Sequence, residues 1–107
     1  MRIDPAIVRD ILRSLFAYIP EHDVCVESFA LAPYGPDDEV LAHWDRLRDA
    51  GWIVETNDVR SNRGEDFLTY RPAGRAYEWA TSAWDEERWA EASERLPSAL
   101  EDVEVAG

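Results

Sequence analysis

The chain has 107 residues, of which 46% are hydrophobic and 11% aromatic. This length allows one compact domain that buries a core without disulfides or metals, and it excludes a second domain of ordinary size. The chain has 23 acidic and 11 basic residues, and its formal net charge is -12. A domain this acidic does not gain the counterion-release free energy that drives non-specific nucleic-acid binding, so we expect no direct nucleic-acid partner.

Cysteine content and hydropathy predict the compartment. Cys25 is the only cysteine, so no disulfide can form within the chain, and a reducing cytoplasm is the simplest location. The N-terminus lacks the basic and apolar regions of a secretory signal, and the apolar runs are far shorter than a membrane span. We therefore expect a soluble cytoplasmic protein with no membrane partner.

A first helix is predicted from Pro5 to Ile19. Asp4 fits an N-cap followed by proline at the first helical position, and apolar residues recur at helical spacing until Pro20. Residues 22–34 have a mixed pattern that indicates a short strand or an irregular segment, followed by a turn through residues 33–36.

A second helix is predicted from residue 36 or 37 to Gly51, which suits a left-handed C-cap. Residues 52–54 and 67–70 are typical of two strands, joined by a polar loop over residues 57–66, and together they predict a hairpin. The apolar stripe of the second helix consists of Val40, Leu41, Trp44 and Leu47.

A third helix is predicted to begin at Pro72. Ser82 and Asp85 resemble a capping box, so this helix is expected to break there, restart and end at Pro97. We expect one domain over residues 1–96, followed by an acidic, frayed tail over residues 97–107. The apolar face of this helix consists of Ala73, Ala76, Tyr77, Ala80 and Trp84.

This order of elements resembles a winged helix. The passage LRDAGWI over residues 47–53 is similar to the LxxxGLI passage that joins recognition helix and wing in such proteins. The runs VLAHWDRLRDAGWI and LTYRPAGRAYEWA, with Trp89 beyond them, resemble a family of small uncharacterised phage and prophage proteins over roughly residues 3–90. Tyr77 stands where that family has phenylalanine. The resemblance implies an α+β, winged helix-turn-helix-like domain with a C-terminal helical extension, and it supplies no catalytic residues.

No motif predicts catalysis, a metal or a cofactor. The segment Glu21–Cys25 contains three metal-capable residue types, but a zinc site needs four ligands with paired spacing, and the only other histidine is His43. We interpret the segment as a helix-exit turn with a buried cysteine. His43 is expected to form hydrogen bonds at the edge of the core, because no motif places a nucleophile near it. We expect a non-enzymatic protein.

The solvent face of the second helix is predicted to be acidic. On a helical wheel the apolar stripe lies opposite Asp38, Glu39, Ala42, Asp45, Arg46 and Asp49, which is four acids and one base. The phosphates of DNA would be repelled by this face. It is either a solvated surface or a binding surface, and carboxylates one helical turn apart, at about 6 Å, can imitate successive phosphates.

The tryptophan content is high for this length. Of five tryptophans, Trp44 and Trp52 are expected in the core. The three on the last helices either fill a close-packed helix pair or place at least one ring at an interface. The predicted partner-binding residues are Asp38, Glu39, Asp45, Asp49, Trp79, Trp84 and Trp89.

The function expected from these features is inhibition of a host protein. The chain is interpreted as a monomeric or homodimeric phage or mobile-element protein that binds a nucleic-acid-handling defence complex, as anti-CRISPR proteins do, with nucleic-acid mimicry by its acidic surface. The alternative is a winged-helix transcriptional regulator that binds DNA through its wing. That alternative requires a continuous positive surface. The arginines in or beside the predicted wing are Arg60, Arg63, Arg71 and Arg75.

Overall fold

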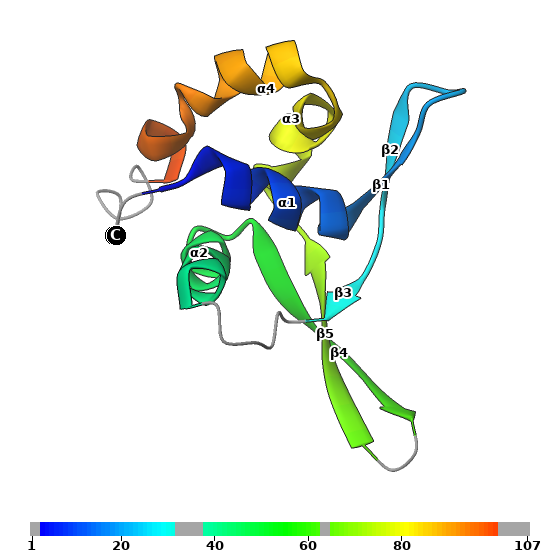
Figure 1. Ribbon diagram of the computed structural model, residues 1–107. Coiled ribbons are helices and arrows are strands. Elements are labelled where there is room, and N and C mark those ends of the chain that lie inside the picture. The colour runs from blue at the N-terminus through cyan, green and yellow to red at the C-terminus, as the bar shows by residue number, and fades with distance from the viewer. Residues whose placement is uncertain (1–2, 32–37, 63–64, 101–107) are drawn as a thin grey trace.

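The computed structural model describes residues 3–31, 38–62 and 65–100, with side chains for all of these except 31, 57–62 and 65–68. They form a mixed α+β domain with two small antiparallel sheets (Figure 1). The elements are α1 (Pro5–Leu15), β1 (Phe16–Ile19), β2 (Val24–Glu27), β3 (Ala30–Leu31), α2 (Asp38–Asp49), β4 (Ile53–Asn62), β5 (Glu65–Pro72), α3 (Ala76–Ala80), the 3-10 helix η1 (Thr81–Trp84) and α4 (Glu86–Ser93). Residues 96–100 are also helical.

Helix α1 begins where the sequence predicts and ends earlier. The Asp4 carboxylate accepts a hydrogen bond from the Ala6 amide at 3.0 Å, and Pro5 occupies the first turn. The predicted end at Ile19 is wrong, because Phe16–Ile19 is strand β1 and pairs with β2. Spacing alone did not separate the two structures, since a four-residue strand after a helix can continue the apparent helical period.

Strands β1 and β2 form a two-stranded antiparallel ribbon that projects from the body (Figure 1). Its base is closed by the Ser28 amide, which donates to the Leu15 carbonyl at 2.9 Å. Of the two alternatives for residues 22–34, a short strand or an irregular segment, the structure shows strands, β2 and β3. The predicted turn over residues 33–36 lies outside the described residues.

Helix α2 leads into the second sheet, whose strand order is β3-β5-β4. Gly51 has a φ of 82°, and the Trp52 amide donates to the Leu47 carbonyl at 2.9 Å, so the predicted left-handed C-cap is confirmed. The predicted polar loop over residues 57–66 is mostly wrong, because β4 and β5 pair as far as Asn62 and Glu65. Backbone pairing does not require apolar side chains, so the polar sequence concealed the long hairpin.

The C-terminal helices also differ from expectation at their prolines. Pro72 is the last residue of β5 instead of the first residue of a helix, and α3 begins at Ala76. The predicted break is confirmed, although the cap of α4 is Asp85, whose carboxylate accepts from the Arg88 amide at 2.9 Å. Pro97 lies inside helical residues 96–100, where a proline near a helix start needs no amide hydrogen.

The core surrounds α1, which lies between the C-terminal helices and the layer formed by α2 and the second sheet (Figure 1). Trp52 and Trp79 stack with ring centroids 5.6 Å apart, and Trp79 meets Trp89 edge to face at 6.4 Å. Ala99 and Leu100 are also buried, so the core extends past the boundary expected at residue 96, while residues 101–107 of the predicted tail lie outside the described residues. None of the described helices combines the length and apolar character needed to cross a bilayer.

Candidate functional site

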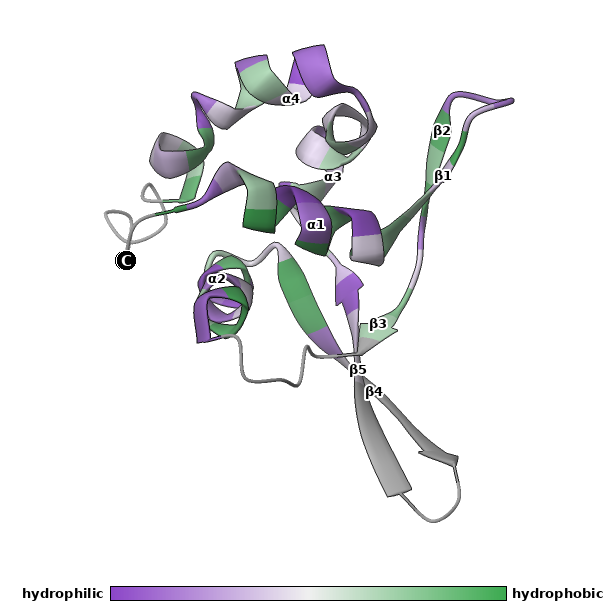
Figure 2. Ribbon diagram, in the orientation of Figure 1, coloured by the Kyte–Doolittle hydropathy of each residue, from purple (hydrophilic) through white to green (hydrophobic). Residues whose placement is uncertain are grey.

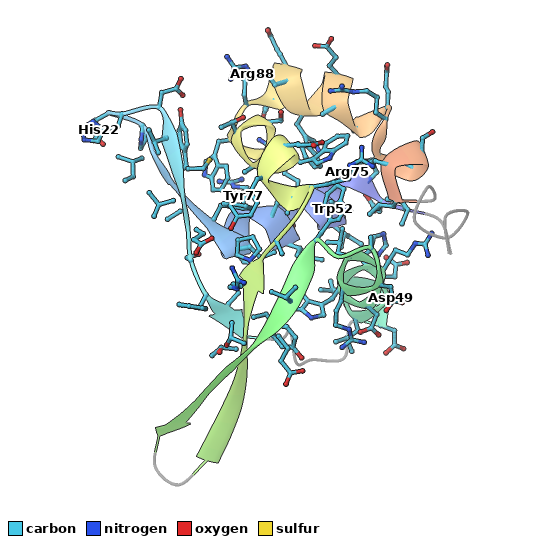
Figure 3. All side chains as sticks on the ribbon, turned by 180° about the vertical axis from the view of Figure 1, so that it is seen from behind. His22, Asp49, Trp52, Arg75, Tyr77 and Arg88 are labelled. Carbon is cyan, nitrogen blue, oxygen red and sulfur yellow. The ribbon has the colours of Figure 1, made fainter. Side chains whose placement is uncertain are left out.

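The predicted acidic surface is present on α2. Asp38, Glu39, Asp45 and Asp49 are all exposed, and we call these four residues the α2 acidic face. Trp44 and Leu47 of the predicted apolar stripe are buried, whereas Val40 and Leu41 are only partly buried. Figure 3 shows Asp49 on the outer side of the helix. The helical period therefore placed the carboxylates correctly.

The two arginines of α2 differ in their surroundings. Arg46 was placed on the solvent face, yet its guanidinium donates to the Leu100 carbonyl at 3.3 Å and faces the C-terminal helical residues. Arg48 is the exposed base, and it forms an ion pair with Asp45 at 3.1 Å. Their side chains are 45% and 58% exposed, so this pair contributes at most about 1 kcal/mol and can exchange for a partner's cation.

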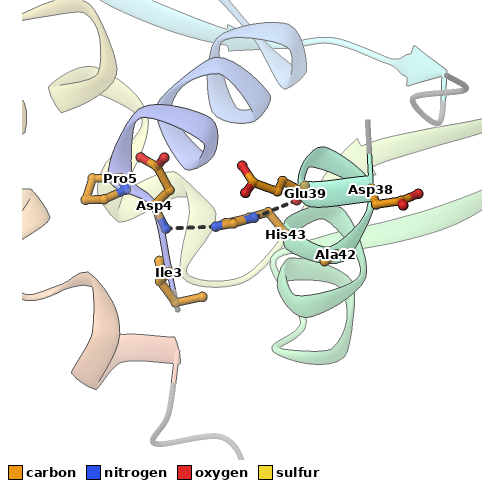
Figure 4. Close-up of a pocket in the computed structure, with 7 residues that line it drawn as sticks. All are labelled: Ile3, Asp4, Pro5, Asp38, Glu39, Ala42 and His43. Carbon is orange, nitrogen blue, oxygen red and sulfur yellow. Dashed lines mark hydrogen bonds between the residues drawn. The ribbon is translucent and has the colours of Figure 1, made fainter. Parts of the chain in front are cut away.

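His43 braces α2 against the start of α1 (Figure 4). Its side chain is buried, Nε2 accepts from the Asp4 amide at 2.8 Å, and Nδ1 donates to the Glu39 carbonyl at 2.7 Å. Because Nε2 accepts a hydrogen bond, the ring must be the neutral tautomer that carries its proton on Nδ1. The predicted hydrogen-bonding role is confirmed. Because both ring nitrogens form hydrogen bonds with main-chain groups, this imidazole has a structural role.

A pocket of about 530 Å³ opens beside this brace. Its lining brings Asp4, Asp38 and Glu39 together, and among the described residues that line it there is no serine or cysteine that His43 could activate. The pocket continues the negative surface of the α2 acidic face. The lining residues are Ile3, Asp4, Pro5, Asp38, Glu39, Ala42 and His43.

Two of the three predicted interface tryptophans are buried. Trp79 and Trp89 are each 6% exposed, so neither can anchor a partner, and this part of the prediction is wrong. The physical reason is the turn at Asp85, which folds α4 back so that both indoles pack in the core. Trp84 is partly buried, stacks on Tyr18 at 5.5 Å, and has the Arg13 guanidinium 5.9 Å from its ring centroid.

An exposed apolar surface on the β1–β2 ribbon was missed. The pairs Ala17↔Val26 and Ile19↔Val24 point to one face, because directly opposed residues share a face of an antiparallel ladder. Val24 is 46% and Val26 is 45% exposed. Figure 2 shows hydrophobic residues on this ribbon although it projects from the body. We call these four side chains the ribbon apolar face.

The sequence contained a signal for this ribbon. FAYI and VCVE flank the turn PEHD, and their alternate residues share a face. Phe29, next to the ribbon, is 51% exposed, and Tyr77 is 47% exposed. Assigning Phe16–Ile19 to the first helix concealed the pattern, because a helical reading separates Ala17 and Ile19 onto different faces.

The opposite face of the ribbon is held by tyrosine hydroxyls. Tyr18 donates to the Asp23 carboxylate at 2.7 Å, and this hydrogen bond raises the pKa of Tyr18. Tyr77 donates to Glu27, and this bond likewise raises the pKa of Tyr77. Burial raises the pKa of the Cys25 thiol, with a smaller contribution from the charge of Asp23. Cys25 is therefore a poor nucleophile at neutral pH.

The predicted wing arginines do not form one described surface. Arg71 is exposed on β5, whereas Arg75 pairs with Glu78 at 3.6 Å and donates to the Ala99 carbonyl at 3.5 Å. Arg75 thus faces the C-terminal helices, while strands β4 and β5 run away from them toward Asn62 and Glu65 (Figure 1). The side chain of Arg60 and all of Arg63 lie outside the described residues.

Within the part of the chain that the structure describes, no group of three or more His, Cys, Asp and Glu side chains could hold a metal ion. Comparison of the chain with protein-family models, with curated proteins and with solved structures found no match. The resemblance to phage winged-helix proteins therefore stays a prediction, and the geometry of the surfaces has to support the function.

Proposed function

We propose that this protein is a non-enzymatic binding domain whose α2 acidic face docks on a basic surface of a nucleic-acid-handling protein. The observation that carries the proposal is the exposure of all four carboxylates along one helix, with Arg46 turned away toward Leu100. Such a face attracts a basic groove and accelerates encounter with it. Within this face Asp45 and Asp49 are one helical turn apart, with Cβ atoms about 6 Å from each other, a separation comparable to that of successive phosphates along a strand.

The sheet topology supports a winged-helix interpretation of this face. Helix α2 directly precedes the β4–β5 hairpin, and β3 pairs with β5 on the other side. In a winged helix the corresponding helix presents its outer face to the major groove. An acidic outer face opposes phosphate and instead complements the protein surfaces that bind phosphate. We propose the specific case of a phage protein that inhibits a host defence complex, as anti-CRISPR proteins do.

The ribbon apolar face supplies a second contact for the same partner. Large exposed apolar groups on a charged domain are typical of interaction sites. Burying the exposed half of Val24 and of Val26 would contribute about 1 kcal/mol each. The partner's contact surface is thus basic with an adjoining apolar segment.

The test compares two neutralised variants in affinity capture from a bacterial lysate. One variant replaces the α2 acidic face with Asp38→Asn, Glu39→Gln, Asp45→Asn and Asp49→Asn. The matched control replaces four exposed glutamates of the C-terminal helices with Gln, namely Glu86, Glu87, Glu91 and Glu94. Both variants change the net charge equally, and each also alters two acids in the first turn of a helix.

The wild type and the control are expected to capture the same nucleic-acid-binding protein, and the α2 variant is expected to lose it. Added duplex DNA should displace the captured protein, and raising the salt concentration should weaken capture. Equal capture by both variants, or capture that ignores salt and DNA, would exclude the α2 acidic face as the docking surface.

The regulator alternative is supported by exposed Arg71 on β5. It predicts sequence-specific binding of duplex DNA that weakens when Arg60 and Arg63 are replaced by Ala. Our proposal predicts negligible DNA binding at physiological salt, because the α2 acidic face repels phosphate. A mobility-shift titration separates the two functions.

A further inference from the structure

A second pocket, separate from the α2 acidic face, lies between the α3–η1 stretch and the C-terminal helical residues. Its volume is about 320 Å³. It brings together two arginines, two serines and one carboxylate, so cations outnumber acids there although the whole chain carries -12. The lining residues are Arg75, Glu78, Trp79, Ser82, Arg95, Ser98 and Ala99.

Helical spacing builds both walls of this pocket. Arg75, Trp79 and Ser82 are separated by four and three residues along α3 and η1, so they share one face. Arg95 and Ser98 are separated by three residues on the opposing segment. Two guanidinium groups and two hydroxyl groups therefore line the same pocket from two directions.

Arg95 is held in place by the floor of the pocket. Its guanidinium carbon lies 5.4 Å from the centroid of the Trp79 ring, and Trp79 is in turn fixed by stacking on Trp52. A guanidinium over an indole keeps its N–H groups directed outward in its plane. The backbone of Arg95 bonds within its own segment, but its guanidinium has no hydrogen-bond or ion-pair partner among the residues whose side chains the structure describes, so these donors are available to a ligand.

The other polar groups of the pocket also have donor capacity. Arg75 meets Glu78 at 3.6 Å and Ala99 at 3.5 Å, contacts that are long, and its side chain is 45% exposed. The hydroxyls of Ser82 and Ser98 donate no hydrogen bond to any described residue. This arrangement offers several donors and one acceptor carboxylate.

We propose that this pocket binds a phosphate group, either free or as a small phosphate ester. Two guanidiniums suit the charge and the several oxygens of phosphate better than the single charge of a carboxylate. Within the lining one carboxylate stands against two guanidiniums, so the local charge is positive, and acids more than a Debye length away, about 8 Å at physiological salt, are largely screened. The proposal uses no residue of α2 and is independent of the proposed function.

The experiment follows the indole N–H resonance of Trp79 by NMR, assigned with the Trp79→Phe variant. Sodium phosphate, O-phosphoserine and sodium acetate are titrated separately at constant ionic strength. Phosphate or phosphoserine is expected to cause a saturable shift at millimolar concentration. Acetate is expected to need at least a tenfold higher concentration to cause the same shift. Tighter binding of phosphoserine assigns an ester as the ligand, and equal binding assigns free phosphate; either result supports the pocket.

Two variants of equal charge separate site binding from general electrostatics. Arg95→Gln is expected to weaken phosphate binding at least tenfold, whereas Arg88→Gln, on exposed α4 outside the pocket, should leave it unchanged. Near-UV circular dichroism checks that both variants keep the tryptophan core. The absence of a saturable shift in the wild type, or an equal loss of affinity in both variants, would overturn the proposal.

Discussion

Replacing His43 tests whether a buried imidazole joins α2 to the start of α1. His43→Leu introduces an apolar side chain of similar size and removes both hydrogen bonds, to the Asp4 amide at 2.8 Å and to the Glu39 carbonyl at 2.7 Å. The Glu39 carbonyl lies in α2 and keeps its helical i→i+4 bond, so losing the bond from His43 Nδ1 costs it little free energy. The Asp4 amide loses the acceptor that the structure gives it.

An amide left without an acceptor costs about 1–3 kcal/mol, and an ordinary hydrogen bond contributes about 0.5–1.5 kcal/mol. Because the Asp4 amide is only partly buried, we expect His43→Leu to lower the free energy of unfolding by about 2 kcal/mol. His43→Gln, which retains an acceptor and a donor, should cost less. Exposed His22 in the ribbon turn provides the matched control, and His22→Leu should change stability by less than about 0.5 kcal/mol.

Urea denaturation followed by tryptophan fluorescence measures these differences, since the slope of the transition should stay constant while its midpoint moves. Nitrogen chemical shifts of the His43 ring provide a second readout, because the structure requires the proton on Nδ1. Equal midpoints for His43→Leu and His22→Leu, or a ring protonated at Nε2, would refute the brace.

Three further predictions concern local structure. Asp85→Ala removes the cap that accepts from the Arg88 amide and should cost about 1 kcal/mol in a urea titration. Gly74→Ala should cost more than Gly51→Ala: both have positive φ, but only at Gly74 would a new Cβ lie 3.0 Å from a carbonyl oxygen. Cys25 should react with a disulfide reagent more slowly in the folded protein than in urea at pH 8, because burial raises the pKa of its thiol; equal absorbance traces would contradict this.

Local chemistry made several features predictable from sequence. Asp4 and Pro5 define a helix start, Gly51 adopts the left-handed conformation that ends α2, and the chain breaks near Asp85. Each depends on the backbone preference or hydrogen bonding of one or two residues, which neighbours in space hardly alter. The α2 acidic face was predictable for a related reason, because helical period alone decides which side chains share a side.

The solvent exposure of the tryptophans depended on tertiary structure. Whether Trp79, Trp84 or Trp89 reaches solvent is decided by the angle at which η1 and α4 fold back over α1, and no short-range pattern encodes that angle. The pocket between Arg75 and Arg95 likewise exists only because two segments meet.

Strand pairing also depended on tertiary structure. Phe16–Ile19 satisfies helical spacing with α1 and alternation within β1, and the partner strand Val24–Glu27 selects the second. The long β4–β5 hairpin forms through backbone hydrogen bonds. Such bonds do not depend on residue type, so the polar sequence gave no strand pattern. Sequence by itself determined the start of α1, the end of α2, the break near Asp85 and the charge of α2, where the energies are local. Pairing and burial determined the ribbon apolar face and the tryptophan core, where the partners are distant in the chain.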